Sequence, residues 1–315
     1  MQTECNFKKF SMAVLTTRLT MLGLLFISGQ AWSESPVLMI NAEAAKSPIT
    51  VTPLRNNISV LEGSGGNIGV LAGKEGKFMV DSGIAVSKDK IESALNKLGP
   101  SPVKYVVNTH WHWDHTDGNE WLHNKGATII ATPNVVKYMS TTTRVNDWDY
   151  TFKPFPKGGI PAKTITEPTT YEFEGETIIA TPVAPGHTDG DIYVYFKKAD
   201  VLFLGDLFWN GVYPFIDNDQ GGSIGGMIND INAVLKVPTD NTQIVPGHGP
   251  VGTRAQLIEY RDMLTNIRDN VAKLKMQGMS LEQVIAAKPT QKYDAKWGQF
   301  VINPDFFTKL VFNGL

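Results

Sequence analysis

The chain has 315 residues, of which 42% are hydrophobic and 19% are charged, and its formal net charge is -2. These proportions are ordinary for a folded soluble protein, and the length allows one large domain or two small ones. A charge this close to zero gives no electrostatic reason to expect a nucleic acid or an anionic membrane as a partner.

The N-terminal residues have the layout of a secretory signal peptide. Two lysines and an arginine precede an apolar run at 19–27, and the small residues Ala31 and Ser33 have the spacing of a cleavage site. The run is about half as long as the roughly 20 residues that a membrane-spanning helix requires, so no stable membrane anchor is expected. We expect residues 1–33 to be removed and the protein to be periplasmic or secreted, in a bacterium.

Removal of this segment would also take away Cys5, the one cysteine of the chain. The mature chain would then have neither thiolates nor disulfides, which suits an oxidising compartment. Any metal ion must therefore be held by His, Asp or Glu side chains.

The first half of the mature chain is predicted to alternate strands and helices. Four apolar stretches separated by Asn- and Gly-rich turns predict strands, and GSGGN at 63–67 is interpreted as a hairpin turn because it lacks the Lys-Ser/Thr of a phosphate loop. Asp117 and Glu120 resemble the N-cap and capping-box residues of a helix. The expected elements are strands at 49–54, 58–63, 67–73, 77–83, 103–110 and 127–133, and helices at 86–99, from 117 and from 134.

The second half again alternates predicted strands and helices, after an irregular segment. Residues 140–165 lack clear periodicity and are rich in Pro, Gly and aromatic residues, which is typical of a functional or mobile loop. Strand stretches then end in Gly-His or Gly-Asp, and helical patterns cover 223–236 and 253–287. With no recognisable linker, we predict one α+β domain over 34–315. It should have two sheets packed face to face, helices outside, and C-terminal helices from about 253.

Five of the six histidines lie at strand ends or in glycine-flanked turns, and the sixth, His123, is expected on a helix surface. Alternate side chains of an extended segment share a face, so His110 and His112 can hold one metal ion together. The residues that follow them can reach a second ion. Residues at the ends of three later strands complete the set of ligands. The predicted ligands, all nitrogen or oxygen donors, are His110, His112, Asp114, His115, His187, Asp206 and His248. This donor set suits two Zn²⁺ ions per chain, and Fe or Mn would also fit.

The motif THWHWDH at 109–115 resembles the H-x-H-x-D-H signature of the metallo-β-lactamase superfamily. GHTDGD at 186–191, FLGDLF at 203–208 and PGHG at 247–250 resemble its later motifs, in the same order. The resemblance covers roughly residues 55–250. It implies a four-layer αββα sandwich with the metals at one edge.

The resemblance also implies which residue serves which ion. The first metal would be bound by His110, His112 and His187. The second would be bound by Asp114, His115 and His248, and Asp206 would bridge the two.

Two divalent ions that share a water lower its pKa and supply hydroxide at neutral pH. We therefore predict a dinuclear zinc hydrolase in which a metal-bridging hydroxide attacks a carbonyl substrate, an ester, lactone, thioester or β-lactam. Asp114 and Asp206 are the predicted catalytic residues, and Asp114 should also orient the hydroxide. Asp81, at the end of a predicted strand, is either a partner of a ligand histidine or the cap of a turn.

The substrate is left open by the sequence. A bridging Asp206 resembles glyoxalase II, lactonase and general hydrolase branches, whereas export suits a β-lactamase. Glyoxalase II is disfavoured because no cluster of basic residues is evident in 253–315. A nuclease is disfavoured by the absence of a basic patch. A mononuclear iron redox member, resembling the persulfide dioxygenases, is a further alternative, but the complete set of seven ligands favours hydrolysis.

Aromatic residues near the expected site can either line a pocket or pack a loop. Six are candidates for pocket lining: Trp148, Tyr150, Phe152, Phe155, Trp209 and Tyr213. Strand alternation is expected to turn Trp111 and Trp113 away from the metals. The expected partner is a small-molecule substrate, and the oligomeric state is not predicted.

Overall fold

Residues 35–315 are described by a computed structural model, and the signal peptide predicted for residues 1–33 lies outside the described residues. The first half of the described chain forms a seven-stranded sheet in the order β1-β2-β3-β4-β5-β6-β9. Strands β1 to β4 pair antiparallel, whereas β4, β5, β6 and β9 run parallel. The strands are β1 (Thr50–Pro53), β2 (Ile58–Glu62), β3 (Ile68–Ala72), β4 (Lys77–Val80), β5 (Val103–Val107), β6 (Thr128–Ala131) and β9 (Lys163–Thr164).

The second half contributes a five-stranded sheet in the order β10-β11-β12-β13-β14. Its neighbours pair antiparallel except for β13 and β14, which are parallel. In β12 every second side chain is fully buried, as expected of a strand with one face on the core. The strands are β10 (Thr169–Phe173), β11 (Glu176–Pro182), β12 (Ile192–Phe196), β13 (Val201–Phe203) and β14 (Gln243–Val245).

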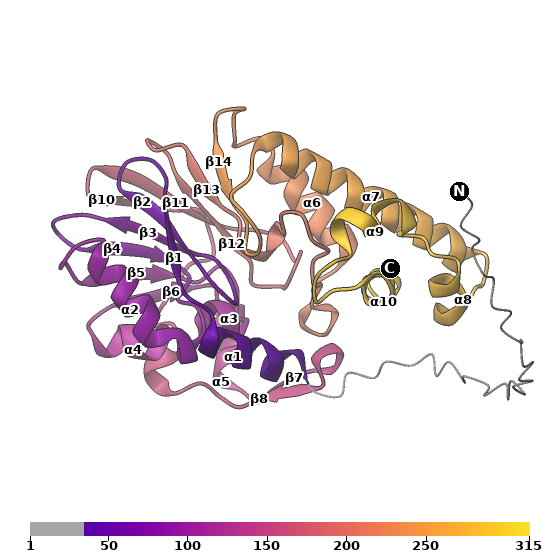
Figure 1. The fold of residues 1–315 in the computed structure, drawn as a ribbon, viewed down its shortest axis with the longest axis horizontal. Helices are drawn as coiled ribbons and strands as arrows, with labels where there is room; N and C mark the ends of the chain where they lie inside the picture. The colour runs from indigo at the N-terminus through magenta and orange to yellow at the C-terminus, as the bar shows by residue number, and fades with distance from the viewer. Residues whose placement is uncertain (1–34) are drawn as a thin grey trace, which may run out of the picture. The chain divides into compact units, whose positions relative to one another are not determined.

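Helices cover the outer faces of both sheets (Figure 1). Buried side chains of α2 and α4 pack on the first sheet, and those of α6 and α7 pack on the second. The ten α-helices of the described chain are α1 (Pro36–Lys46), α2 (Lys88–Lys97), α3 (Trp113–Thr116), α4 (Asn119–Asn124), α5 (Pro133–Ser140), α6 (Ile224–Val234), α7 (Arg254–Met276), α8 (Leu281–Ala286), α9 (Gln291–Trp297) and α10 (Pro304–Asn313).

A third cluster of buried apolar side chains fills the space between the two sheets. Phe78 of β4 meets Phe196 of β12 edge to face, with their ring centroids 6.2 Å apart, a favourable arrangement for aromatic pairs. The αββα sandwich predicted from the sequence is thereby confirmed.

The strands and helices predicted in the first half are present with shifted ends, and one detail is wrong. Asp117 is not the N-cap of a helix, because it is the C-cap residue of α3 and Gly118 occupies the N-cap position of α4. Instead, Asp117 Oδ2 accepts a hydrogen bond from the backbone N–H of Ala85 at 3.0 Å. The segment read as a loop at 140–165 contains a small hairpin of β7 (Thr143–Val145) and β8 (Tyr150–Phe152).

Among the described residues, none of the helices combines the length and the apolar character that crossing a membrane requires.

Candidate metal centre

The directions of four strands bring the predicted ligands to one edge of the sandwich. The histidine motif follows β5 directly. Strands β11 and β13 both lie antiparallel to β12 and so run the same way, and β14 is parallel to β13. His187, Asp206 and His248 follow the carboxyl ends of β11, β13 and β14, respectively. Residues far apart in the sequence therefore meet because their strands end on the same side.

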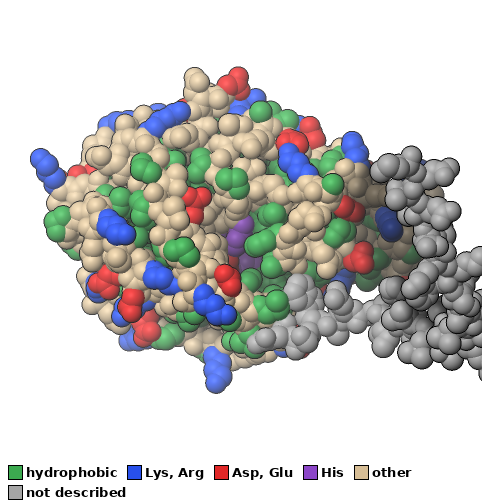
Figure 2. All heavy atoms as spheres, viewed as in Figure 1, with side chains coloured by type: hydrophobic (Ala, Val, Ile, Leu, Met, Phe, Trp, Pro, Cys, Tyr) green, Lys and Arg blue, Asp and Glu red, His purple; other side chains and the backbone are tan. Residues whose placement is uncertain are grey.

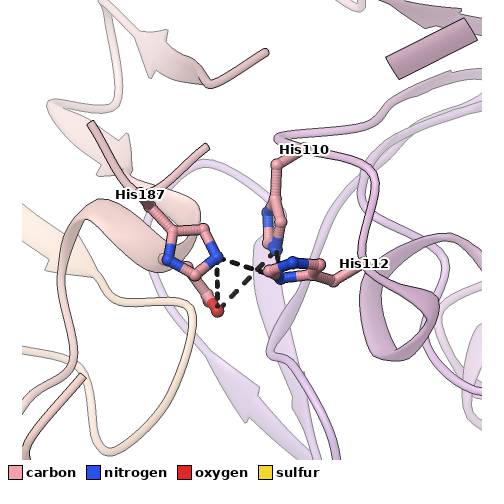
Figure 3. Close-up of side chains that lie close together, drawn as sticks. His110, His112 and His187 are labelled. Atoms are coloured by element: carbon pink, nitrogen blue, oxygen red, sulfur yellow. Dashed lines mark hydrogen bonds and ion pairs between the residues drawn. The ribbon is translucent and has the colours of Figure 1, made fainter. Parts of the chain in front are cut away.

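Three histidines and one aspartate, all buried, form the first cluster. Nδ1 of His112 lies 3.0 Å from Nε2 of His110 and 3.0 Å from Nε2 of His187. Oδ2 of Asp206 lies 3.7 Å from Nε2 of His110 and 3.5 Å from Nε2 of His187. The three imidazole rings point toward one another (Figure 3). Donors that converge so closely can hold a divalent ion such as zinc.

The second cluster consists of Asp114, His115 and His248. Nε2 of His248 lies 3.3 Å from Oδ2 of Asp114 and 3.4 Å from Nε2 of His115. Oδ1 of Asp206 lies 3.1 Å from Nε2 of His115 and 3.4 Å from Nε2 of His248. The second cluster therefore shares Asp206 with the first.

Asp206 directs one carboxylate oxygen to each cluster. Its Oδ1 is buried and, although the ring nitrogens of His115 and His248 lie 3.1 and 3.4 Å away, no described residue donates a well-aligned hydrogen bond to it, which is costly for a carboxylate oxygen. A cation bound to that oxygen would remove this cost, so the residues fit a pair of metal ions. All seven predicted ligands come together, and the two clusters are consistent with a dinuclear metal site. His123 is exposed on α4 and belongs to neither cluster.

The pKa values of these groups in the metal-free protein follow from burial and from their neighbours. Burial lowers the pKa of His187 to about 3 and holds the pKa of His110 well below its usual value. Burial also opposes protonation of His248, but Asp206 and Asp114 outweigh it and raise the pKa of His248 to about 9. Burial would raise the pKa of Asp206, but the neighbouring imidazoles, His248 first, hold it well below its usual range. In the first cluster, His110 and His187 are thus neutral imidazoles and Asp206 is a carboxylate, the protonation states that bind metals.

Asp81, directly after β4, is the partner of a ligand histidine. Its Oδ2 lies 2.8 Å from Nδ1 of His115 and accepts a hydrogen bond from Thr109 Oγ1 at 2.8 Å. Its Oδ1 accepts from the backbone N–H of Thr109 at 2.7 Å. Asp81 thereby fixes the ring of His115 with Nε2 toward the cluster. Its φ of 64° is uncommon for a non-glycine residue and is of a kind that concentrates at functional sites.

Asp217 is a buried functional residue that the sequence reasoning missed. Its Oδ2 lies 2.9 Å from Nε2 of His112 and accepts from Nε1 of Trp111 at 3.3 Å. Because His112 faces the cluster through Nδ1, its Nε2–H is free to donate to this carboxylate. In the same loop, the Phe215 carbonyl lies 3.0 Å from Nδ1 of His187. The sequence around Asp217 contains no signal that separates it from an ordinary loop aspartate.

A cavity of about 530 Å³ opens over the two clusters and includes Asp114, Asp206, His112 and His248 in its lining. In Figure 2, histidine side chains lie at the base of a hollow flanked by hydrophobic side chains. The cavity is large enough for a small-molecule substrate. Its aromatic lining residues are Trp113, Trp148, Trp209, Phe215, Phe300 and Phe306.

The sequence does not decide whether six aromatic residues line the cavity or pack a loop. In the structure, both roles occur among them. Trp148 and Trp209 line the cavity. Tyr213 is buried and donates a hydrogen bond to Asp294 at 2.8 Å. The other three line a separate shallow depression and pack the hairpin: Tyr150, Phe152 and Phe155.

The two tryptophans of the histidine motif also have different roles. Trp111 is fully buried, and its ring meets Phe152 edge to face at 5.3 Å, so it is turned away from the cavity as predicted. The prediction for Trp113 is wrong, because Trp113 lines the cavity and donates to Asn41 Oδ1 at 3.0 Å. Helix α3 begins at Trp113, so strand alternation no longer applies there.

The protein is a sandwich of two helix-covered sheets with a buried His/Asp cluster at one edge. This combination is typical of a class of metal-dependent hydrolases. The sequence profile described as the metallo-beta-lactamase superfamily matches residues 61–262. The chain therefore belongs to this superfamily and is a metal-dependent hydrolase.

Curated relatives of the chain are hydrolases. It is 27% identical over 199 residues to a protein of Methanocaldococcus jannaschii described as a "probable metallo-hydrolase", covering 61% of this chain and 91% of that protein. It is 30% identical over 159 residues to the hydroxyacylglutathione hydrolase of Brucella ovis, covering 50% of this chain. The chain spans about half of that enzyme's length, 52%.

Solved structures share the fold. A metallo-β-lactamase from Pontibacter korlensis superposes with a TM-score of 0.55 at 20% identity, covering 69% of this chain and 99% of that one. A stereoselective inverting sec-alkylsulfatase from Pseudomonas sp. superposes with a TM-score of 0.63 at 14% identity, covering 87% of this chain and 51% of that one. At these identities the likeness concerns the fold alone.

Proposed function

We propose that this protein is a dinuclear zinc hydrolase that cleaves the acyl bond of a small carbonyl compound, an ester, lactone, thioester or β-lactam. The observation that carries the proposal is Asp206, whose two oxygens face two separate sets of nitrogen and oxygen donors. When bound, two zinc ions lower the pKa of a shared water and polarise the substrate carbonyl.

The residues of this chain supply the remaining parts of the reaction. Asp114 lines the cavity, and although burial opposes its ionisation, His115 and His248 lower its pKa. It is therefore a carboxylate at neutral pH and can orient the attacking water through a hydrogen bond. The apolar cavity wall excludes bulk water from the carbonyl, which strengthens electrostatic interactions at the clusters.

The alternatives have less support. A mononuclear iron redox enzyme would make little use of Asp114, His115 and His248, which form a complete second cluster. Among the candidate acyl substrates, β-lactam antibiotics and the glutathione thioester named by the Brucella relatives carry a carboxylate, and this makes them less favoured than neutral esters and lactones. No Lys or Arg lines the cavity in the described part of the chain to pair with such a group. We also propose that residues 1–33 direct export, with a small molecule as the partner in the periplasm or outside the cell.

Two measurements test the proposed function. The zinc-loaded protein should contain close to two ions per chain by mass spectrometry and should hydrolyse at least one of a panel of aryl esters, lactones, thioesters and β-lactams. Asp206→Ala should lose this activity and bind less metal, whereas Asp262→Ala, an exposed carboxylate on α7, should retain both. One tightly bound iron with oxygen uptake on a persulfide would favour the redox alternative, and full activity of Asp206→Ala would refute the bridging role.

A further inference from the structure

The wall of the cavity contains one charged side chain besides the metal-cluster residues. Six aromatic side chains and several aliphatic ones line it, and in the described chain no Lys or Arg does. The exception is Glu43 of α1. Apolar walls disfavour an ionic group on a ligand unless a partner of opposite charge is present. The chemistry of this wall therefore bears on which substrates can enter.

Helix α1 places Glu43 at the cavity. Pro36, Ile40 and Glu43 all line the cavity, and their spacing of four and three residues puts them on one helical face. The helix is tied to the rest of the cavity wall, because Trp113 Nε1 donates to Asn41 Oδ1 at 3.0 Å. Ser35, its N-cap residue, donates to the Trp148 carbonyl at 2.7 Å. Glu43 thus lies on a helix that is anchored to Trp113 and Trp148 of the same cavity lining.

The carboxylate of Glu43 is available to a ligand. It is exposed, and Oε1 accepts a hydrogen bond from Ser47 Oγ at 2.8 Å. No cation pairs with it among the described residues. Lys90, the lysine that contacts this helix, donates to the carbonyls of Ala44 and Ser47 instead.

The charges around the site also give an anion no advantage. Asp114 and Asp206 lie in the clusters, Asp217 lies behind His112, and Glu43 lies on the wall. These four carboxylates balance the charge of two divalent ions. A substrate anion would therefore enter a cavity that offers it no surplus of positive charge away from the ions themselves.

We propose that the cavity selects an acyl substrate whose far end carries an ammonium group, bound by Glu43 and by the faces of the aromatic rings, and that it discriminates against anionic substrates. Aromatic rings attract cations through their negative faces, and a carboxylate beside them adds charge pairing. Glu43 is then a specificity-determining residue outside the metal clusters. The proposal rests on the acyl-hydrolase function proposed above.

Three p-nitrophenyl esters that differ only at the far end of the acyl chain test this selection. The ends are trimethylammonium, the neutral isostere tert-butyl, and carboxylate. For the zinc-loaded protein we expect kcat/KM to be about tenfold higher for the ammonium ester than for the tert-butyl ester, a ratio within the range of a desolvated cation–aromatic contact, and lowest for the carboxylate ester. Equal values for the ammonium and tert-butyl esters, or a preference for the carboxylate ester, would overturn the proposal.

Substitutions at Glu43 separate its role from that of the rings. Glu43→Gln should reduce the ammonium preference, the ratio of kcat/KM for the ammonium ester to kcat/KM for the tert-butyl ester, at least threefold. Glu43→Lys should reverse the order of the ammonium and carboxylate esters. Glu167→Lys, which makes the same charge change at an exposed position outside the cavity lining, should leave all three values unchanged. An unaltered preference in Glu43→Gln contradicts the assignment.

A binding assay on the zinc-loaded protein distinguishes the failure of this inference from the failure of the proposed function. Trp113, Trp148 and Trp209 line the cavity and report occupancy by fluorescence. Non-hydrolysable ether analogues of the three compounds should bind in the same order, ammonium first. If no ester is hydrolysed but this order holds, the acyl-hydrolase function fails and the charge selection stands. If esters are hydrolysed but the three analogues bind with equal affinity, the proposed preference for an ammonium group fails.

Discussion

Asp217→Asn should weaken the binding of one metal ion and leave the other largely unaffected. Asp217 Oδ2 lies 2.9 Å from Nε2 of His112 and accepts from Trp111 Nε1 at 3.3 Å, and the carboxylate is fully buried. Asparagine offers one oxygen in place of two and places an N–H₂ group where a second acceptor was. The imidazole of His112 would lose its charged partner, and its Nδ1 would become a weaker and less well oriented donor to the first cluster.

The expected magnitude follows from the strength of that hydrogen bond. A bond to an ionised carboxylate is roughly twice as strong as a neutral one and contributes about 1.5–3 kcal/mol. Replacing the carboxylate by a neutral amide should therefore cost about 1–2 kcal/mol. Since about 1.4 kcal/mol corresponds to tenfold in an equilibrium constant, affinity for the first ion should fall by about tenfold. This agrees with the 10–100-fold range typical of residues that orient a ligand histidine.

Competition with a chromophoric zinc chelator measures the two affinities separately. Asp219→Asn is the matched control, because Asp219 is exposed in the same turn and its Oδ2 accepts from the Asn146 backbone at 2.8 Å. The control should bind both ions as the unmodified chain does. Circular dichroism of the metal-free variants establishes that each is folded. Affinity for the first ion that is unchanged within twofold in Asp217→Asn, or lowered equally in Asp219→Asn, would refute the reasoning.

The remaining predictions concern packing and pH. Gly66→Ala should reduce the amount of zinc retained during dialysis against a chelator, because the added Cβ would overlap the His115 ring. Gly225→Ala is the control, since Gly225 has open space around it, and it should retain zinc normally. Equal zinc retention in the two variants would contradict the packing argument. The combined contribution of His187 and His248 to the stability of the metal-free protein should be largest near pH 6.5. His187 has a folded pKa of about 3, below its unfolded value, so its contribution is present above pH 6.5 and is lost as the pH falls toward 3. His248 has a folded pKa of about 9, so its contribution is complete below pH 6.5 and is lost as the pH rises through 9. Urea unfolding from pH 4 to 10 tests this, and stability that rises steadily to pH 9 is the contrary result.

The strands and the seven ligands could be predicted because their signals are local. Alternation of buried and half-buried side chains is legible within a few residues, as in Ile192, Val194 and Phe196 of β12. The histidines and aspartates follow strands directly, and strand ends on one side of a sheet necessarily lie near one another. Glycines beside them, such as Gly247 next to Asp206, also have a clear role, because a Cβ there would overlap the carboxylate.

What could not be predicted depends on contacts between distant segments. Asp217 becomes a partner of His112 only because its loop folds back over the histidine motif. Trp113 was assigned to the wrong side because the backbone turns into α3 at that residue, which ends the period-two pattern. For α1, Ser35 and Pro36 are a legible helix start. Nothing in the sequence indicates that the helix forms a wall of the cavity, since that depends on its bonds to Trp113 and Trp148.

The convergence of ligands from both sheets has a mechanical consequence. His110, His112 and His115 follow a strand of the first sheet, whereas His187 and His248 follow strands of the second. Ions held between them would tie the two halves of the sandwich together across long stretches of chain, as a disulfide bond does in a disulfide-bonded protein. The described residues contain no cysteine to provide such a link. Removal of the ions by a chelator would therefore resemble reduction of a disulfide bond in another fold. It would weaken the contact between the two sheets before either sheet unfolds.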